Sequence, residues 1–258
     1  MERMVADFLI RKAFAPANPD EERTPNTQTT AQQILAQLRS GRPIQYVLEE
    51  AWFDERAFYV NESVLIPRPE TEELFHWIKT EQDEFPILNQ ILEIGTGSGI
   101  LAISLKRVFP QAVVTAIDVD EKALIVAKRN AEHFGESVHF QKMNFTDPQA
   151  WNQLPKVDLL VSNPPYIPLS EKDSLSDHVR LYEPPLALFT PAEDPLLFYR
   201  LIATFGRENL LAKGRIYVEM HEDRSQQTQI LFEEMGYQTI VRLDMQGKKR
   251  MLRATILS

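Results

Sequence analysis

The chain has 258 residues, of which 43% are hydrophobic and 25% are charged, and its formal net charge is -9 at pH 7. This length suits one large domain, alone or with a small second one, and no apolar run approaches the roughly 18 residues that a membrane-spanning helix needs. The absence of cysteine excludes disulfides, thiolate metal sites and a cysteine nucleophile. These features fit a cytoplasmic globular protein, and the acidic balance is not typical of a nucleic-acid coat.

The first 68 residues differ from the rest in pattern. Apolar positions at helical spacing predict helices over 2–14 and 29–40, with the polar, proline-containing segment APANPDEERTPNTQ between them. Residues with high strand propensity from Ile44 to Val64 predict a hairpin, and Pro69 suits the first position of a helix. The pattern predicts a helical N-terminal region over 1–42, a hairpin linker over 43–68 and an α/β domain over 69–258.

From residue 89 onward, predicted strands and helices alternate. Several of the strands are continuous apolar runs, as expected for a sheet that is covered on both faces, and the alternation predicts a doubly wound, mostly parallel sheet. The last two strands are close in sequence and should pair as an antiparallel hairpin. The predicted strands are Gln90–Ile94, Ala112–Asp118, Val138–Lys142, Val157–Val161, Arg215–Met220, Gln238–Leu243 and Met251–Leu257, and the helices lie near 99–109, 120–134, 195–211 and 224–235.

A glycine-rich loop, GTGSG, connects the first of these strands to its helix. Gly95, Gly97 and Gly99 allow the backbone to turn sharply and to approach a ligand beside the helix N-terminus. The next strand ends at Asp118, whose carboxylate can accept hydrogen bonds from the two ribose hydroxyls of a nucleoside. We assign Asp120 to the N-cap of the following helix. The pattern predicts nucleoside binding, and the alternative is a tight turn without a ligand.

The segment VSNPPYIP, residues 161–168, follows another predicted strand at the same edge of the sheet. Asn163 offers one acceptor and two donors, and proline has no N–H to commit neighbouring carbonyls to a sheet ladder. The Asn163 side-chain oxygen and the Pro164 backbone oxygen can therefore each accept one N–H of a planar –NH2 group, against the ring of Tyr166. Positioning of this kind can lower a reaction barrier by roughly 7–11 kcal/mol. The five histidines form no spaced ligand set, so we expect no metal.

Several segments together carry a family resemblance. The glycine loop, with Ile100 where a dinucleotide fingerprint has glycine, resembles the first motif of class I S-adenosylmethionine-dependent methyltransferases. The segments GRPIQYVLEEAWF, VLIPRPETEELFHWI, ILEIGTGSGILAISL, VSNPPYIP and VRLYEPPLALF occur in the order typical of the peptide chain release factor glutamine methyltransferases, the HemK/PrmC family. The resemblance covers about residues 41–258, and the segment before it is shorter than the helical N-terminal domain usual in the family.

The resemblance implies a Rossmann-like class I methyltransferase fold, with a seven-stranded, mostly parallel sheet, an antiparallel terminal strand, a small helical N-terminal domain and a linking hairpin. It implies methyl transfer from S-adenosyl-L-methionine to the glutamine amide in the Gly-Gly-Gln motif of class I release factors. Separately, we expect a monomer that binds neither a membrane nor nucleic acid directly. By position, the cofactor site would contain Gly95, Thr96, Gly97, Ser98, Gly99, Asp118, Asn144, Phe145 and Asn163. The glutamine would be held by Asn163, Pro164, Pro165 and Tyr166.

Other roles and functions remain open at this point. Phe145 either stacks on the adenine or is an ordinary core residue. Arg68 either orients the substrate or forms an ion pair between domains, and Glu183 either faces the substrate or is a solvated acid. The residues 167–194 form a long connection of the kind that often serves as a lid. Alternative functions are a methyltransferase for glutamine in a ribosomal large-subunit protein, a nucleic-acid amino-group methyltransferase, a non-enzymatic nucleoside-binding regulator and a nicotinamide-dependent oxidoreductase.

Overall fold

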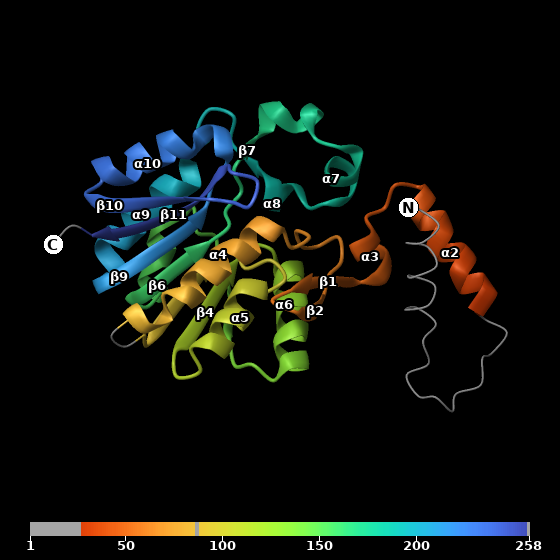
Figure 1. Ribbon diagram of the computed structural model, residues 1–258, viewed down its shortest axis with the longest axis horizontal. Coiled ribbons are helices and arrows are strands. Elements are labelled where there is room, and N and C mark those ends of the chain that lie inside the picture. The colour runs from red at the N-terminus through yellow and green to blue at the C-terminus, as the bar shows by residue number, and fades with distance from the viewer. Residues whose placement is uncertain (1–26, 86–87, 257–258) are drawn as a thin grey trace.

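A computed structural model describes residues 27–85 and 88–256 of the chain. Its centre is a seven-stranded sheet with the strand order β10-β11-β9-β6-β3-β4-β5 (Figure 1). The strands are β3 (Gln90–Ile94), β4 (Val113–Asp118), β5 (His139–Lys142), β6 (Val157–Ser162), β9 (Leu210–Glu219), β10 (Tyr237–Leu243) and β11 (Lys249–Ile256).

The strand directions confirm the predicted fold class. The pairs β5–β4, β4–β3, β3–β6 and β6–β9 are all parallel, while β11 is antiparallel to both of its neighbours, β9 and β10. The predicted terminal hairpin is thus present, and its second strand is inserted between β9 and β10. The parallel strands bring their carboxyl ends to one edge of the sheet, which is where open α/β sheets bind ligands.

Helices cover both faces of this sheet, as Figure 1 shows for α4 and α5 on the near side. Because successive side chains of a strand point to opposite faces, the apolar runs contribute side chains to two hydrophobic cores, one on each face of the sheet. Ile91 and Leu159 pack with α4 and α5, whereas Leu92 and Leu160 pack with α9 and α10. The helices are α4 (Pro69–Thr80), α5 (Ile100–Val108), α6 (Glu121–Phe134), α9 (Leu197–Asn209) and α10 (Ser225–Glu234), with the short 3-10 turns η1 (Gln82–Glu84), η2 (Pro148–Gln153) and η4 (Glu222–Arg224).

The hairpin is present but shorter than predicted, because its first residues are helical. It consists of β1 (Glu50–Phe53) and β2 (Arg56–Tyr59), preceded by α3 (Ile44–Leu48) and α2 (Thr27–Arg39). In α3 the side chain of Tyr46 is fully buried, and its hydroxyl donates to the Val64 carbonyl at 2.6 Å. This tertiary packing overrides the strand propensity of the segment. Helix α2 confirms the helix predicted over 29–40, and the helix predicted over 2–14 lies outside the described residues.

The long connection over 167–194 folds into short elements. They are β7 (Ile167–Pro168), η3 (Leu169–Ser174), α7 (Asp177–Tyr182), α8 (Pro185–Leu188) and β8 (Phe189–Thr190), with β7 and β8 paired in parallel. The Tyr182 hydroxyl donates to the Ser40 carbonyl at 3.0 Å, and His178 Nδ1 lies 2.5 Å from the Gly41 carbonyl. The connection therefore joins the N-terminal helical segment to the edge of the sheet. In the part of the chain that the structure describes, no helix combines the length and apolar character needed to cross a membrane.

Candidate active site

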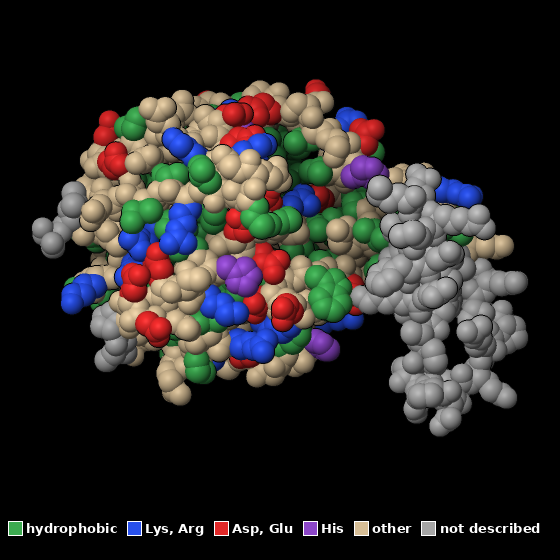
Figure 2. Space-filling model, in the orientation of Figure 1, with side chains coloured by type: hydrophobic (Ala, Val, Ile, Leu, Met, Phe, Trp, Pro, Cys, Tyr) green, Lys and Arg blue, Asp and Glu red, His purple; other side chains and the backbone are tan. Residues whose placement is uncertain are grey.

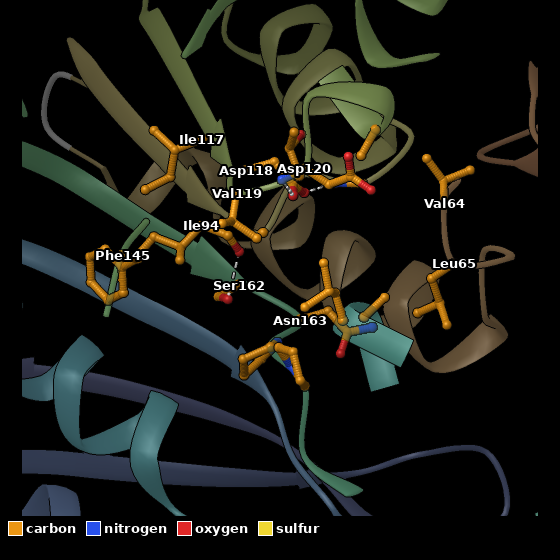
Figure 3. Close-up of a pocket in the computed structure, with 18 of the residues that line it drawn as sticks. Val64, Leu65, Ile94, Ile117, Asp118, Val119, Asp120, Phe145, Ser162 and Asn163 are labelled. Carbon is orange, nitrogen blue, oxygen red and sulfur yellow. Dashed lines mark hydrogen bonds between the residues drawn. The ribbon is translucent and has the colours of Figure 1, made fainter. Parts of the chain in front are cut away.

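A cavity of about 510 Å3 lies at the carboxyl ends of β3, β4 and β6 (Figure 3). Segments far apart in sequence form its wall: the glycine loop, the ends of β4 and β5, the segment after β6, and parts of 63–71 and 184–198. In Figure 3 Phe145 lies toward one end of the cavity, and Val64 and Leu65 lie at the other. Of the predicted site residues, Gly95, Thr96, Gly97, Ser98, Asp118, Asn144, Phe145, Asn163, Pro164, Pro165 and Arg68 line it.

The shape of the glycine loop is set by its backbone conformation. Gly95 and Gly97 have φ angles of 73° and 54°, in the left-handed region that favours glycine. The Gly95 and Thr96 amides both donate to the Ile117 carbonyl, at 2.9 and 3.0 Å, which ties the loop to the neighbouring strand β4. The left-handed glycines and these two hydrogen bonds therefore fix the loop at one side of the cavity.

Gly99 has a different part in this loop. It is not among the described residues that line the cavity, and a Cβ at this position would lie 3.0 Å from the Cβ of Ala127 in α6. Its φ angle is 82°. The glycine is required here by close packing of α5 against α6 and by a left-handed backbone.

Two carboxylates, the buried Glu93 and the half-buried Asp118, hold the loop from two directions. Glu93 Oε2 accepts hydrogen bonds from Thr96 Oγ1 at 2.5 Å and from the Ala102 amide at 3.0 Å, and burial raises the pKa of Glu93 to about 8. Asp118 Oδ2 accepts from the Gly97 amide and Oδ1 from the Asp120 amide, both at 2.9 Å. Burial also raises the pKa of Asp118. Each Asp118 oxygen keeps a second lone pair for a ligand.

Two helix-borne side chains complete this half of the site. Asp120 accepts from the Lys122 amide at 2.9 Å, which confirms it as the N-cap of α6. Asn130 in α6, which sequence reasoning did not single out, donates to the carbonyls of Tyr59 and Ser98 at 2.9 and 2.8 Å and accepts from the Tyr59 amide. It therefore fastens the hairpin to the glycine loop.

The residues after β5 serve both the core and the cavity. Phe145 is 5% exposed and stacks on Trp151, with 5.2 Å between ring centroids and 26° between planes. Asn144 is exposed, and its Oδ1 accepts from the Thr146 amide at 3.1 Å. Phe145 is thus a core residue whose ring also reaches the cavity wall, and its contact with an adenine stays a prediction.

Asn163 follows the end of β6 and has a defined orientation. Its Nδ2 donates to Thr71 Oγ1 in the first turn of α4 at 2.9 Å, so its Oδ1 is left for the cavity. The preceding residue, Ser162, is buried and donates to the Ile94 carbonyl at 2.8 Å, which fixes the strand end against β3. The amide oxygen of Asn163 is therefore presented beside the glycine loop.

Tyr166 lies behind the cavity wall rather than on it. It is not among the described lining residues; its hydroxyl donates to Glu219 Oε1 at 3.1 Å, and its ring meets His221 edge-on at 5.7 Å between centroids. Burial raises the pKa of Tyr166, so the hydroxyl keeps its proton. Direct contact between this ring and a substrate amide remains a prediction.

Besides Asn130, sequence reasoning missed Thr71 and Glu219. Thr71 Oγ1 donates to Glu219 Oε2 at 2.6 Å, and the two residues are 3% and 1% exposed. Glu219 stands in the apolar strand RIYVEM, and a lone acid in such a run was the available signal. Thr71 carried no signal of its own, because its partner is 148 residues away.

Arg68 and Glu183 form one ion pair. Arg68 Nη2 lies 2.6 Å from Glu183 Oε1, and Glu183 Oε2 accepts from the Ile66 amide at 3.2 Å. Glu183 is 4% exposed, so its interpretation as a solvated acid is wrong, and it is not among the described residues that line the cavity. Arg68 combines an ion pair, one of its two predicted roles, with a place on the cavity wall.

Comparison with known proteins shows which family the chain is similar to. Residues 74–178 match the family described as "Methyltransferase small domain". The chain is 43% identical to the "Release factor glutamine methyltransferase" of Flavobacterium psychrophilum over 223 residues, which covers 85% of this chain and 78% of that protein. It is 41% identical to the protein of the same name from Bacteroides thetaiotaomicron, over 88% of this chain and 81% of that one. These relatives confirm the family resemblance seen in the sequence.

A solved structure with the same fold is that of the hMettl16 catalytic domain in complex with a MAT2A 3'UTR hairpin. Its TM-score is 0.62, and the match covers 97% of this chain and 92% of that chain. At 14% sequence identity this likeness concerns the fold alone.

The Arg68–Glu183 pair predicts an asymmetric effect on stability. Arg68→Met leaves a buried carboxylate without its cation and should lower the free energy of unfolding by about 3 kcal/mol. The double variant Arg68→Met/Glu183→Gln removes the orphaned charge as well and should be more stable than the single variant. Urea unfolding of the two variants and the wild type measures this difference. A double variant no more stable than Arg68→Met would contradict the assigned pairing.

Proposed function

The chain belongs to the family of release factor glutamine methyltransferases, and we propose on this premise that it methylates a release factor. The methyl group passes from S-adenosyl-L-methionine to the side-chain amide nitrogen, N5, of the glutamine in the Gly-Gly-Gln motif of a class I factor. The observation that supports this most directly is the Asn163 side chain, whose Nδ2 is bound to Thr71 and whose Oδ1 remains for the cavity beside the glycine loop.

The residues of the cavity suit the nucleoside methyl donor. Its volume of about 510 Å3 lies within the range of small-molecule sites, roughly 300–1,000 Å3. Asp118 has lone pairs for the ribose hydroxyls, the backbone of Gly95 and Gly97 allows close approach, and Ile94 and Phe145 supply apolar surface for the adenine. When bound, the donor supplies an electrophilic methyl group on a sulfonium sulfur.

The chain's own contribution is to orient the glutamine amide. Asn163 Oδ1 and the Pro164 carbonyl each accept one N–H of the amide, which favours a pyramidal nitrogen whose lone pair is directed toward the donor. Positioning of this kind can supply roughly 7–11 kcal/mol of barrier reduction. As the N–CH3 bond forms, the CH3–S bond breaks and its electron pair stays on sulfur. The nitrogen gains positive charge, so the two oxygens bind it more strongly than they bind the neutral amide. The extra proton then leaves to water, so no strong base is required.

The charge distribution supports a protein substrate over a nucleic acid. The net charge is -9, and on the described part of the face seen in Figure 2, acidic and basic side chains are interspersed without forming one basic surface. A methyltransferase acting on duplex or structured nucleic acid would be expected to carry such a surface. Glutamine in a ribosomal large-subunit protein remains the closest alternative substrate.

Docking of the factor is the proposed role of the N-terminal part. We take 1–42 as the docking region, 43–68 as the linker and 69–258 as the catalytic domain, acting as a monomer in the cytoplasm. In support, α2 lies apart from the sheet in Figure 1 and adjoins α7 through Ser40 and Gly41, next to the segment that contributes Pro184 and Leu186 to the cavity wall.

Mass spectrometry provides the test of the reaction. The protein is incubated with S-adenosylmethionine and a class I release factor, and we expect one added methyl on the glutamine of the Gly-Gly-Gln motif. A factor with that glutamine changed to alanine serves as control. Equal labelling of the two factors, or preferred labelling of a ribosomal large-subunit protein offered in the same mixture, would refute the assigned substrate.

Cofactor affinity gives a separate prediction. In Asp118→Asn one of the two oxygens that accept from the Gly97 and Asp120 amides becomes a donor, and the charge is lost. Calorimetry should show about 10- to 100-fold weaker binding of S-adenosylhomocysteine. Asp120→Asn is the matched control, since asparagine caps a helix as well as aspartate does and should change affinity by no more than about three-fold. Equal losses in the two variants would contradict the ribose assignment of Asp118.

A further inference from the structure

Glu219 connects the two polar residues of the NPPY segment from behind the cavity wall. It is the last residue of β9 and is 1% exposed. Oε2 accepts from Thr71 Oγ1 at 2.6 Å and Oε1 accepts from the Tyr166 hydroxyl at 3.1 Å. Thr71 Oγ1 in turn accepts from Asn163 Nδ2 at 2.9 Å. The order Asn163, Thr71, Glu219, Tyr166 is a continuous chain of hydrogen bonds.

The direction of this chain is fixed by proton counting. A carboxylate only accepts hydrogen bonds, and a hydroxyl has a single proton to donate. The proton of Thr71 is committed to Glu219, so its oxygen can only accept from Asn163, which must present Nδ2. If the amide were turned over, Asn163 Oδ1 would face an oxygen with no proton to give, and Nδ2 would face the cavity.

We propose that Glu219 and Thr71 are positioning residues that direct the Asn163 side-chain oxygen into the cavity, where it accepts from the substrate amide. This inference rests on the proposed function, because the value of an acceptor at this point depends on a substrate –NH2. Neither residue touches the reacting atoms; both act through Asn163. An asparagine presenting Nδ2 would oppose the N–H groups of the glutamine and turn its amide oxygen toward the donor.

The second branch explains why a carboxylate stands here. The Tyr166 hydroxyl also donates its single proton to Glu219, so the carboxylate accepts hydrogen bonds from two hydroxyls. A glutamine at 219 would offer one acceptor and one donor, and one of the two hydroxyls would have to turn its proton away. The backbone of Glu219 is held as well, since the Tyr199 hydroxyl donates to its carbonyl at 3.1 Å.

The acid is retained at an energetic cost. Within residues 27–85 and 88–256 no Lys, Arg or His forms an ion pair with Glu219, and desolvation raises its pKa to about 7 despite the hydrogen bonds from Thr71 and Tyr166. Glu70 on α4 raises the pKa further and Arg250 on β11 lowers it. Burying a carboxylate without a cation costs free energy. We therefore expect the hydrogen bonds that Glu219 accepts to have a function.

Protonation of Glu219 should reverse the direction of the hydrogen bonds from Glu219 through Thr71 to Asn163. Below a pH of about 7 Glu219 gains a proton, and as a donor to Thr71 it lets the threonine proton turn toward Asn163, which then presents Nδ2 to the cavity. The wild-type kcat should therefore fall as pH decreases through about 7. The other titratable groups around this point are Glu70, Arg250, Tyr166, Tyr199 and His221. The two tyrosines have raised pKa values, and His221 has a lowered one.

Four variants test the positioning role, with kcat and KM measured on a release factor at a pH of about 8. Thr71→Val removes the acceptor for Asn163 Nδ2, and Glu219→Met removes the acceptor for the Thr71 proton, so each should lower kcat by about 10- to 100-fold. Thr71→Ser restores the hydroxyl and should keep kcat within about three-fold of the wild type. Thr228→Val is the matched control: Thr228 is fully buried in α10, and its hydroxyl has no hydrogen-bond partner among the described residues.

Affinity for S-adenosylhomocysteine, measured by calorimetry, separates positioning from structural damage. It should stay within about three-fold of the wild type in all four variants. The inference is overturned if either Thr71→Val or Glu219→Met keeps its kcat, if Thr71→Ser fails to restore it, or if the loss is matched by lost cofactor affinity. A wild-type protein that fails to methylate the factor would instead refute the proposed function.

Discussion

A hydroxyl group has one proton, and in this molecule the proton of Thr71 goes to a buried carboxylate. Thr71 Oγ1 donates this proton to Glu219 Oε2 at 2.6 Å, so it can only accept from Asn163 Nδ2. The side-chain oxygen of Asn163 is thereby left for the cavity. An amide nitrogen is a poor nucleophile, so a methyltransferase acting on it needs acceptors in fixed places more than it needs a base. The direction of one asparagine side chain is therefore the constraint on which the proposed chemistry depends.

The fold brings the members of this arrangement together from distant parts of the chain. Thr71 comes from the first turn of α4, Asn163 follows β6, and Glu219 ends the neighbouring strand β9. The parallel register places Ser162 opposite Val218. The residues that follow them, Asn163 and Glu219, therefore lie side by side at the carboxyl edge of the sheet. The glycine loop after β3 reaches the same edge, and the site of the nucleoside is next to the site of the amide.

The sequence predicted what depends on local pattern. Continuous apolar runs located the sheet, and the loop from Gly95 to Gly99 and Asn163 stood out because their residue types are unusual after a buried strand. Ile44–Leu48 was expected in a strand and is helical, because burial of Tyr46 outweighs local propensity. The pairs Arg68–Glu183 and Thr71–Glu219 span 115 and 148 residues. No local pattern reports such distant partners, so only the folded chain reveals them.

A crystal structure with S-adenosylhomocysteine and a Gly-Gly-Gln peptide would show directly which atom Asn163 presents to the substrate. We expect the glutamine amide nitrogen to lie about 2.9 Å from both Asn163 Oδ1 and the Pro164 carbonyl, at ordinary hydrogen-bond distance, with Asn163 Nδ2 still bound to Thr71. A glutamine whose amide oxygen faces Asn163, or an Asn163 that has released Thr71 and turned Nδ2 to the substrate, would contradict this expectation.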